Sequence, residues 1–128
     1  MNALGSTTWL IPDGFRPVTG VEPYPSHEAI CVLNTGDADA NLRVTVYLED
    51  AEPIEGFALC CEARRTRHIR TTSICSPDGR EIPKAVPYAM LVESDVPVVV
   101  QYSRMDCTQP AMTLMTTMAH PVEPGGAG

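Results

Sequence analysis

The sequence predicts an all-β protein, a sandwich of two antiparallel sheets built from seven or eight short strands. Its 128 residues include 12 prolines and 9 glycines, which leave little room for helices longer than about three turns. Apolar and β-branched runs alternate with turn signals about every eight to twelve residues, a spacing typical of sandwiches. We expect one domain over residues 1–120 and a flexible, proline- and glycine-rich tail over residues 121–128.

The N-terminal part predicts two strands. Residues 7–11 form a β-branched and aromatic run that ends in a turn at Pro12-Asp13-Gly14, and a loop then extends to residue 25. Residues 28–34 are apolar at both odd and even positions. Because strands covered on both faces show this pattern, we expect residues 28–34 in the centre of a sheet.

The middle part predicts three strands. Residues 41–48 alternate between apolar and polar or aromatic side chains, so one face of this strand should meet water. Residues 57–61 follow as the next strand, and residues 66–70 continue as a strand or an extended edge.

The C-terminal part predicts three more strands. Residues 88–94 and 98–106 are two strong strands joined by a turn at residues 95–97. Residues 113–119 are rich in methionine, and we favour a strand there although the spacing also fits a helical turn.

Composition and charge argue against several functions. The chain has 16 acidic against 9 basic residues, and this net charge of -7 opposes binding to nucleic-acid phosphates. The N-terminus has neither a basic stretch nor a long apolar run, so we expect a cytoplasmic protein without membrane insertion. The 5 cysteines contain no C-x-x-C pair and the 3 histidines lie far apart, so we expect no metal and no cofactor.

Catalytic motifs are missing from the sequence. It contains no G-x-S-x-G, P-loop or G-x-G-x-x-G pattern, and no cysteine has the surroundings of a known nucleophile motif. We therefore predict that the protein is not an enzyme, has no catalytic residues and acts by binding.

One basic segment contrasts with the acidic composition. Residues 64–70 contain four of the nine basic residues, all of them arginines. If this segment is extended, its even-numbered side chains share one face and Arg65 and Arg67 lie on the other. Guanidinium groups can hold carboxylates or hydroxyl-rich ligands, and ion pairing with the chain's own acidic residues is the alternative explanation.

Positions outside this segment are also candidates for recognition. His27 and Glu28 lie where a loop enters a strand, so the sheet can orient side chains that a ligand still reaches. Trp9, the single tryptophan, is either a core anchor or a flat surface for a sugar ring. The polar residues Gln101, Ser103 and Arg104 interrupt an otherwise apolar strand, as polar residues do at pockets and interfaces.

Three segments of the sequence resemble a known family. They are SHEAICVLNTGD at residues 26–37, ARRTRHIR at residues 63–70 and SDVPVVVQYSRMD at residues 94–106. Together they closely resemble the sensory rhodopsin transducer family, and the likeness extends from about residue 9 to residue 119. The resemblance implies a jelly-roll-like β-sandwich of about eight strands that assembles as a cytoplasmic homotetramer.

The resemblance also implies a function. Our leading hypothesis is a noncatalytic module that binds a small polar ligand, with carbohydrate as a candidate, and signals to a protein partner. The alternative is an adaptor that needs no ligand and binds a sensory rhodopsin or another signalling protein directly. The ligand-binding candidates are Trp9, His27, Glu28, Arg65, Thr66, His68, Gln101 and Arg104.

Overall fold

The structure, a computed structural model, describes residues 2–17, 26–107 and 111–123 and consists almost entirely of β-strands. The predicted all-β, jelly-roll-like antiparallel sandwich of about eight strands is confirmed. The described part contains β1 (Ser6–Phe15), β2 (His27–Asn34), β3 (Ala40–Leu48), β4 (Ile54–Cys61), β5 (Arg65–Arg70), the 3-10 turn η1 (Thr71–Ser73), β6 (Pro87–Asp106), β7 (Thr113–Met118) and β8 (His120–Pro121). None of the described residues form a helix with the length and apolar character needed to cross a membrane.

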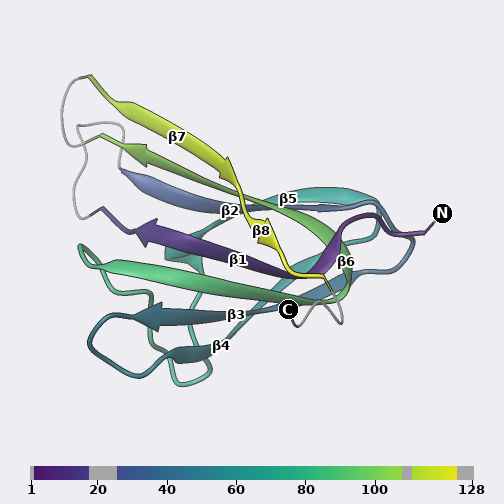
Figure 1. The fold of residues 1–128 in the computed structure, drawn as a ribbon, viewed down its shortest axis with the longest axis horizontal. Coiled ribbons are helices and arrows are strands. Elements are labelled where there is room, and N and C mark those ends of the chain that lie inside the picture. Colours follow the sequence, from purple (N-terminus) through teal and green to yellow (C-terminus); the bar gives the residue numbers. More distant parts are fainter. Residues whose placement is uncertain (1, 18–25, 108–110, 124–128) are drawn as a thin grey trace.

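Two antiparallel layers share the long strand β6 (Figure 1). The first sheet has the order β4-β3-β6-β1-β8, and the second has the order β5-β2-β6-β7. The first half of β6 runs through the first layer, and the strand then bends and returns through the second layer. The backbone of β6 therefore passes from one sheet into the other without a break.

The continuity of β6 corrects the prediction of two strands separated by a turn. Its first half pairs with β3 as far as Ser94, and its second half pairs with β2 from Val99 onward. Residues 95–97, which the sequence assigns to a turn, bend the strand where its partners change. Proline has no N–H group to donate to a neighbouring strand. It is tolerated at residue 97 because this position has no register partner in either sheet.

A second turn signal also lies inside a strand. The sequence predicts that the first strand ends at Pro12, but β1 continues to Phe15. The pairing of β1 with β6 shifts register between Ile11 and Gly14, so the proline falls in a bulge. Gly14 is needed there, because a Cβ atom would lie 2.6 Å from the ring of Tyr88.

The described end of the chain pairs with β1. Pro121 belongs to β8, which pairs with β1, and the N–H of Val122 donates to the carbonyl of Thr8 at 2.9 Å. The residues from 124 onward lie outside the described part of the chain. The paired chain thus extends beyond residue 120, the predicted end of the domain.

The hydrophobic core lies between the layers and follows the predicted alternation. On β3 the side chains of Val44 and Val46 are fully buried, whereas Arg43 and Tyr47 are exposed; Thr45, on the face predicted to meet water, is an exception and is buried. β2 lies between β5 and β6, so its predicted central position is confirmed. The strands predicted at residues 57–61, 66–70 and 113–119 correspond to β4, β5 and β7.

Candidate functional site

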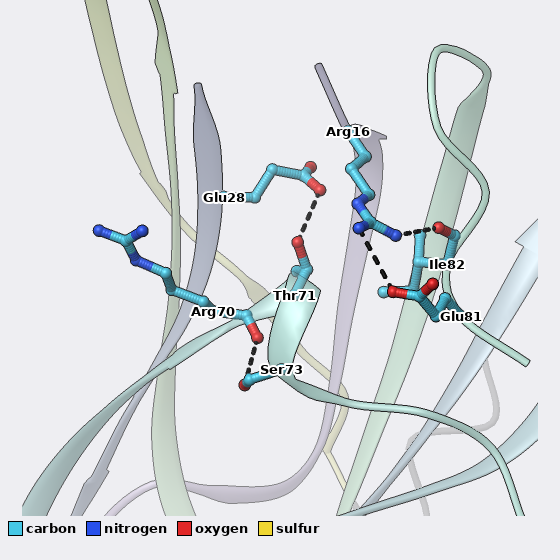
Figure 2. A network of polar contacts seen from close by, with 7 residues as sticks. All are labelled: Arg16, Glu28, Arg70, Thr71, Ser73, Glu81 and Ile82. Carbon is cyan, nitrogen blue, oxygen red and sulfur yellow. Dashed lines mark hydrogen bonds and ion pairs between the residues drawn. The ribbon is translucent and has the colours of Figure 1, made fainter. Parts of the chain in front are cut away.

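A fully buried carboxylate lies at one end of the sandwich. Glu28, near the start of β2, has no exposed surface. Its two oxygens accept hydrogen bonds from the hydroxyls of Tyr88 (2.7 Å), Thr71 (3.0 Å) and Tyr102, and from the N–H of Phe15 (2.9 Å). Figure 2 shows the bond between Glu28 and Thr71 of η1. We call these five residues the Glu28 cluster, and it connects β1, β2, η1 and both halves of β6.

The electrostatics of the Glu28 cluster keep its tyrosines protonated. Burial raises the pKa of Tyr88, and the charge of Glu28 raises it further. Burial also raises the pKa of Tyr102, together with its hydrogen bond to Glu28. Arg104, which lies opposite Glu28 in the pairing of β2 with β6, acts on both pKa values in the opposite direction. Both hydroxyls therefore serve as stable donors to the carboxylate.

A buried arginine fastens a neighbouring loop. Arg16, only 6% exposed, donates from Nη1 to the carbonyl of Ile82 at 2.7 Å and from Nη2 to Glu81 at 3.4 Å (Figure 2). Its Nε is buried and has no partner among the described residues. The guanidinium thus ties the end of β1 to the loop that precedes β6.

A buried amide closes the opposite end of β2. The side chain of Asn34 donates to the carbonyls of Ala38 (2.9 Å) and Cys61 (3.1 Å), and its oxygen accepts from the N–H of Gly36 (3.0 Å). Asn34 has no exposed surface. Polar networks with structural roles therefore occupy both ends of the sandwich.

Trp9 is part of the core. Its indole is 5% exposed, and Nε1 donates to the carbonyls of Ser6 (2.9 Å) and Val98 (3.0 Å). Of the two interpretations that the sequence leaves open, this geometry fits the core anchor.

Four of the predicted ligand residues share the outer face of the second sheet. His68, Cys31 and Gln101 lie side by side across β5, β2 and β6. Thr66 lies in the next row, and His27 lies at the start of β2 on the same face. None of the described strands packs on this outer face, where Leu33 of β2 is 44% exposed.

A groove separates the free edges of β4 and β5. Its volume is about 410 Å³, and its apolar lining includes Leu59, Ile69 and Ile74. Arg67 reaches across the groove, where its Nη1 donates to the carbonyl of Cys60 at 2.7 Å. The remaining lining residues are Asn41, Ala58 and Ser73.

The arginines of residues 64–70 do not pair with acidic residues in the described part of the chain. The two arginine ion pairs found there are those of Arg16 with Glu81 and of Arg80 with Asp78. Arg65 instead donates from Nη1 to the carbonyl of Arg64 at 3.0 Å. Ion pairs among the described residues therefore do not explain this basic segment, although the charge of Arg64 helps to lower the pKa of Asp37.

The structure divides the predicted ligand residues among several places. Thr66, His68, Gln101 and His27 lie on the outer face, whereas Glu28 and Arg104 face the interior at one end. Arg65 begins β5 beside the turn after β4, and Trp9 lies in the core of the first sheet. The groove residues Asn41, Arg67 and Ser73 were not among the candidates. Alternation separates Arg67 from Thr66 and His68, but nothing in the sequence indicates which edge faces β5.

Metal-ligating side chains do not gather in the described residues. No group of three or more histidine, cysteine, aspartate or glutamate residues there is arranged to hold a metal ion. Five free cysteines include two buried thiols, Cys61 and Cys107, and burial raises the pKa of Cys61.

Comparison with known proteins identifies the family. The family model described as Anabaena sensory rhodopsin transducer matches residues 4–121. The chain belongs to this family. The structure is similar to that of Thermotoga maritima 1070, with a TM-score of 0.81 and 37% identity over 93% of this chain and 97% of that chain. It is also similar to the Anabaena sensory rhodopsin transducer, with a TM-score of 0.69 and 37% identity over 80% and 91% of the two chains. No curated protein matches the sequence.

Membership of the transducer family confirms the resemblance seen in the sequence. The three segments that carry it, residues 26–37, 63–70 and 94–106, contain β2, β5 and the second half of β6. These strands are neighbours in the second sheet. The transducer signature of this chain is therefore concentrated in the sheet that carries the outer face and one wall of the groove.

We predict that removal of the buried carboxylate strongly destabilises the fold. Glu28→Ala leaves three buried hydroxyls and the partly buried N–H of Phe15 without their acceptor, which should lower the free energy of unfolding by about 3 to 5 kcal/mol. Urea denaturation followed by circular dichroism measures this loss. The control Glu52→Ala removes an exposed carboxylate and should change stability by less than about 0.5 kcal/mol. A loss below about 1 kcal/mol in Glu28→Ala would contradict the role of the Glu28 cluster.

We also predict that alkaline pH weakens the fold through the two tyrosines. Folding raises the pKa of both tyrosines above the unfolded value of about 10. Their contribution to the free energy of unfolding is therefore complete below about pH 10 and is lost as the pH rises further. Urea denaturation between about pH 9 and pH 11.5 should show a falling free energy of unfolding. In Tyr102→Phe the free energy of unfolding should fall less steeply with pH, by up to about 1.4 kcal/mol per pH unit. An identical slope in wild type and variant would refute the assignment.

Proposed function

We propose that this protein is a noncatalytic signalling module that binds a small polar ligand, such as a carbohydrate, and passes the bound state to a protein partner. Its membership of the sensory rhodopsin transducer family supports a signalling role. The groove between β4 and β5 carries the ligand-binding part of the proposal, because it combines apolar and polar lining. Sugars fit such a lining, since they present both apolar C–H surfaces and hydroxyl groups.

The strand β5 connects the groove to the outer face. Arg67 lies on the groove side of β5, and its neighbours Thr66 and His68 lie on the outer face. β5 pairs with β2 alone among the described strands. Because it is hydrogen-bonded on one side only, it can move more easily than a central strand. A ligand that binds Arg67 would shift the two neighbouring side chains, and we assign the partner contact to the outer face.

A ligand-independent adaptor is the second candidate function. The outer face favours it, because this surface is a broad sheet rather than a hollow, and Leu33 and Met118 are 44% and 55% exposed on it. Apolar side chains beside His68 and Gln101 suit a protein partner, such as a sensory rhodopsin or another signalling protein. In this function the Glu28 cluster and Trp9 fix the fold that presents the face.

The proposed assembly is a cytoplasmic homotetramer. β7 pairs only with β6 among the described strands, and its Leu114 is 63% exposed. Free apolar edges favour association with further copies because they leave strand hydrogen bonds and apolar area uncovered. The net charge of -7 argues against nucleic acid as the partner.

Light scattering after size exclusion tests the assembly. We expect a mass four times the 13.9 kDa of one chain, and a smaller mass for the double variant Leu114→Lys, Met118→Lys on the edge strand β7. A mass of 13.9 kDa for the wild type at micromolar concentration would rule out the homotetramer.

A thermal-shift screen against sugars and related metabolites tests ligand binding. A ligand at about a hundredfold excess over its Kd should stabilise the folded state by about 2.7 kcal/mol and raise Tm. Ser73→Ala in the groove should weaken binding roughly fivefold by removal of one hydrogen bond, whereas Ser103→Ala on the outer face should not. No shift with any compound, together with binding to a receptor protein, would favour the adaptor. If Ser103→Ala weakens binding and Ser73→Ala does not, the ligand binds on the outer face and not in the groove.

A further inference from the structure

The charge of the groove between β4 and β5 indicates what kind of ligand it takes. Arg67 is exposed and uses one N–H bond, to the carbonyl of Cys60, so four of the five donors of its guanidinium have no protein acceptor in the described structure. The described lining contains no aspartate or glutamate. In a chain with 16 acidic residues, the described lining of this groove thus carries the positive charge of Arg67 and no negative charge of its own.

The surrounding arginines add to the same field. Arg64, Arg65 and Arg70 flank Arg67 on β5 and in the turn before it, and none forms an ion pair with a carboxylate in the described residues. Arg70 points away from the Glu28 cluster (Figure 2), so its charge stays outside the interior network. A negative ligand that approaches this edge is attracted, whereas the acidic remainder of the surface repels it.

The other polar groups of the groove have the opposite hydrogen-bonding character. Asn41 donates one of its two side-chain amide N–H groups and its backbone N–H to the carboxylate of Asp95, at 2.9 and 2.8 Å. Its Oδ1 is left as an acceptor. Ser73 donates its hydroxyl proton to the carbonyl of Arg70 at 2.7 Å, so its oxygen also remains an acceptor. Both oxygens accept from donors such as ligand hydroxyls, and the carboxylate of Asp95 beside Asn41 repels an oxyanion there.

We infer that the groove binds a small hydroxylated anion, a sugar acid or sugar phosphate, with its oxyanion on Arg67 and its hydroxyls toward Asn41 and Ser73. Carboxylate and phosphate share the chemistry that matters here, because both accept two parallel hydrogen bonds from a guanidinium. The apolar residues Leu59 and Ile69 contact the ring. This inference rests on the ligand-binding function proposed above and names the ligand class.

Isothermal titration calorimetry with glucose, glucuronate and glucose 6-phosphate tests the inference. At low salt at least one of the two anions should bind ten times or more tightly than glucose, and added salt should reduce this preference. Arg67→Gln should remove most of the preference and leave only the attraction by the neighbouring arginines, and Arg67→Lys should keep an intermediate part because an ammonium cannot form the two parallel hydrogen bonds. The matched control Lys84→Gln removes one positive charge in the loop before β6 and should keep the full preference.

Several outcomes would overturn the inference. Equal affinity for glucose and for both anions would refute it and leave the proposed function intact. A preference that survives undiminished in a folded Arg67→Gln variant, checked by circular dichroism, would also refute it. Inorganic phosphate that binds as tightly as glucose 6-phosphate would show that the groove does not read hydroxyls. Absence of binding by all three sugars would count against the ligand-binding function itself.

Discussion

A carboxylate without exposed surface must replace its lost hydration by hydrogen bonds, and Glu28 obtains them from four segments of the chain. Burial of an unpartnered carboxylate is so unfavourable that the donors must be in place whenever the protein is folded. Tyr88 lies in the half of β6 that belongs to the first sheet, and Tyr102 lies in the half that belongs to the second. Both hydroxyls meet at the same carboxylate. The position of β1, the direction of η1 and the return of β6 all follow from this requirement.

The two ends of β2 explain why recognition is assigned to the flank and the outer face. Glu28 at its start and Asn34 at its end are fully buried in satisfied polar networks, with the core residues Ile30 and Val32 between them. The interior therefore has no free polar group at these two positions to offer to a ligand. The groove between the free edges of β4 and β5 does offer polar groups, because the two sheets of a sandwich pack through their inner faces and their edge strands stay apart.

The sequence is informative where structure is local and uninformative where it depends on distant pairing. Alternation correctly places Thr66 and His68 on one face of β5 and Arg67 on the other, because strand periodicity needs no knowledge of partners. Arg64, expected to share the face of Thr66, lies in the turn with a φ of 56°. Pro12 and Pro97 are misleading, since a bulge and a change of partner strand accommodate proline as readily as a turn does. The partners of Glu28 were not foreseen, because they lie far apart in the sequence and their convergence depends on the bend in β6.

The bend in β6 also determines how the molecule can come apart. In many sandwiches the layers are joined by loops, so one sheet can fray while the other stays intact. Here a single strand supplies a central member to each layer, and it exchanges hydrogen bonds with β1, β2, β3 and β7. If β6 leaves one sheet, the hydrogen bonds that it forms in the other sheet are weakened as well. Amide protons of both layers should therefore exchange with solvent in one concerted opening.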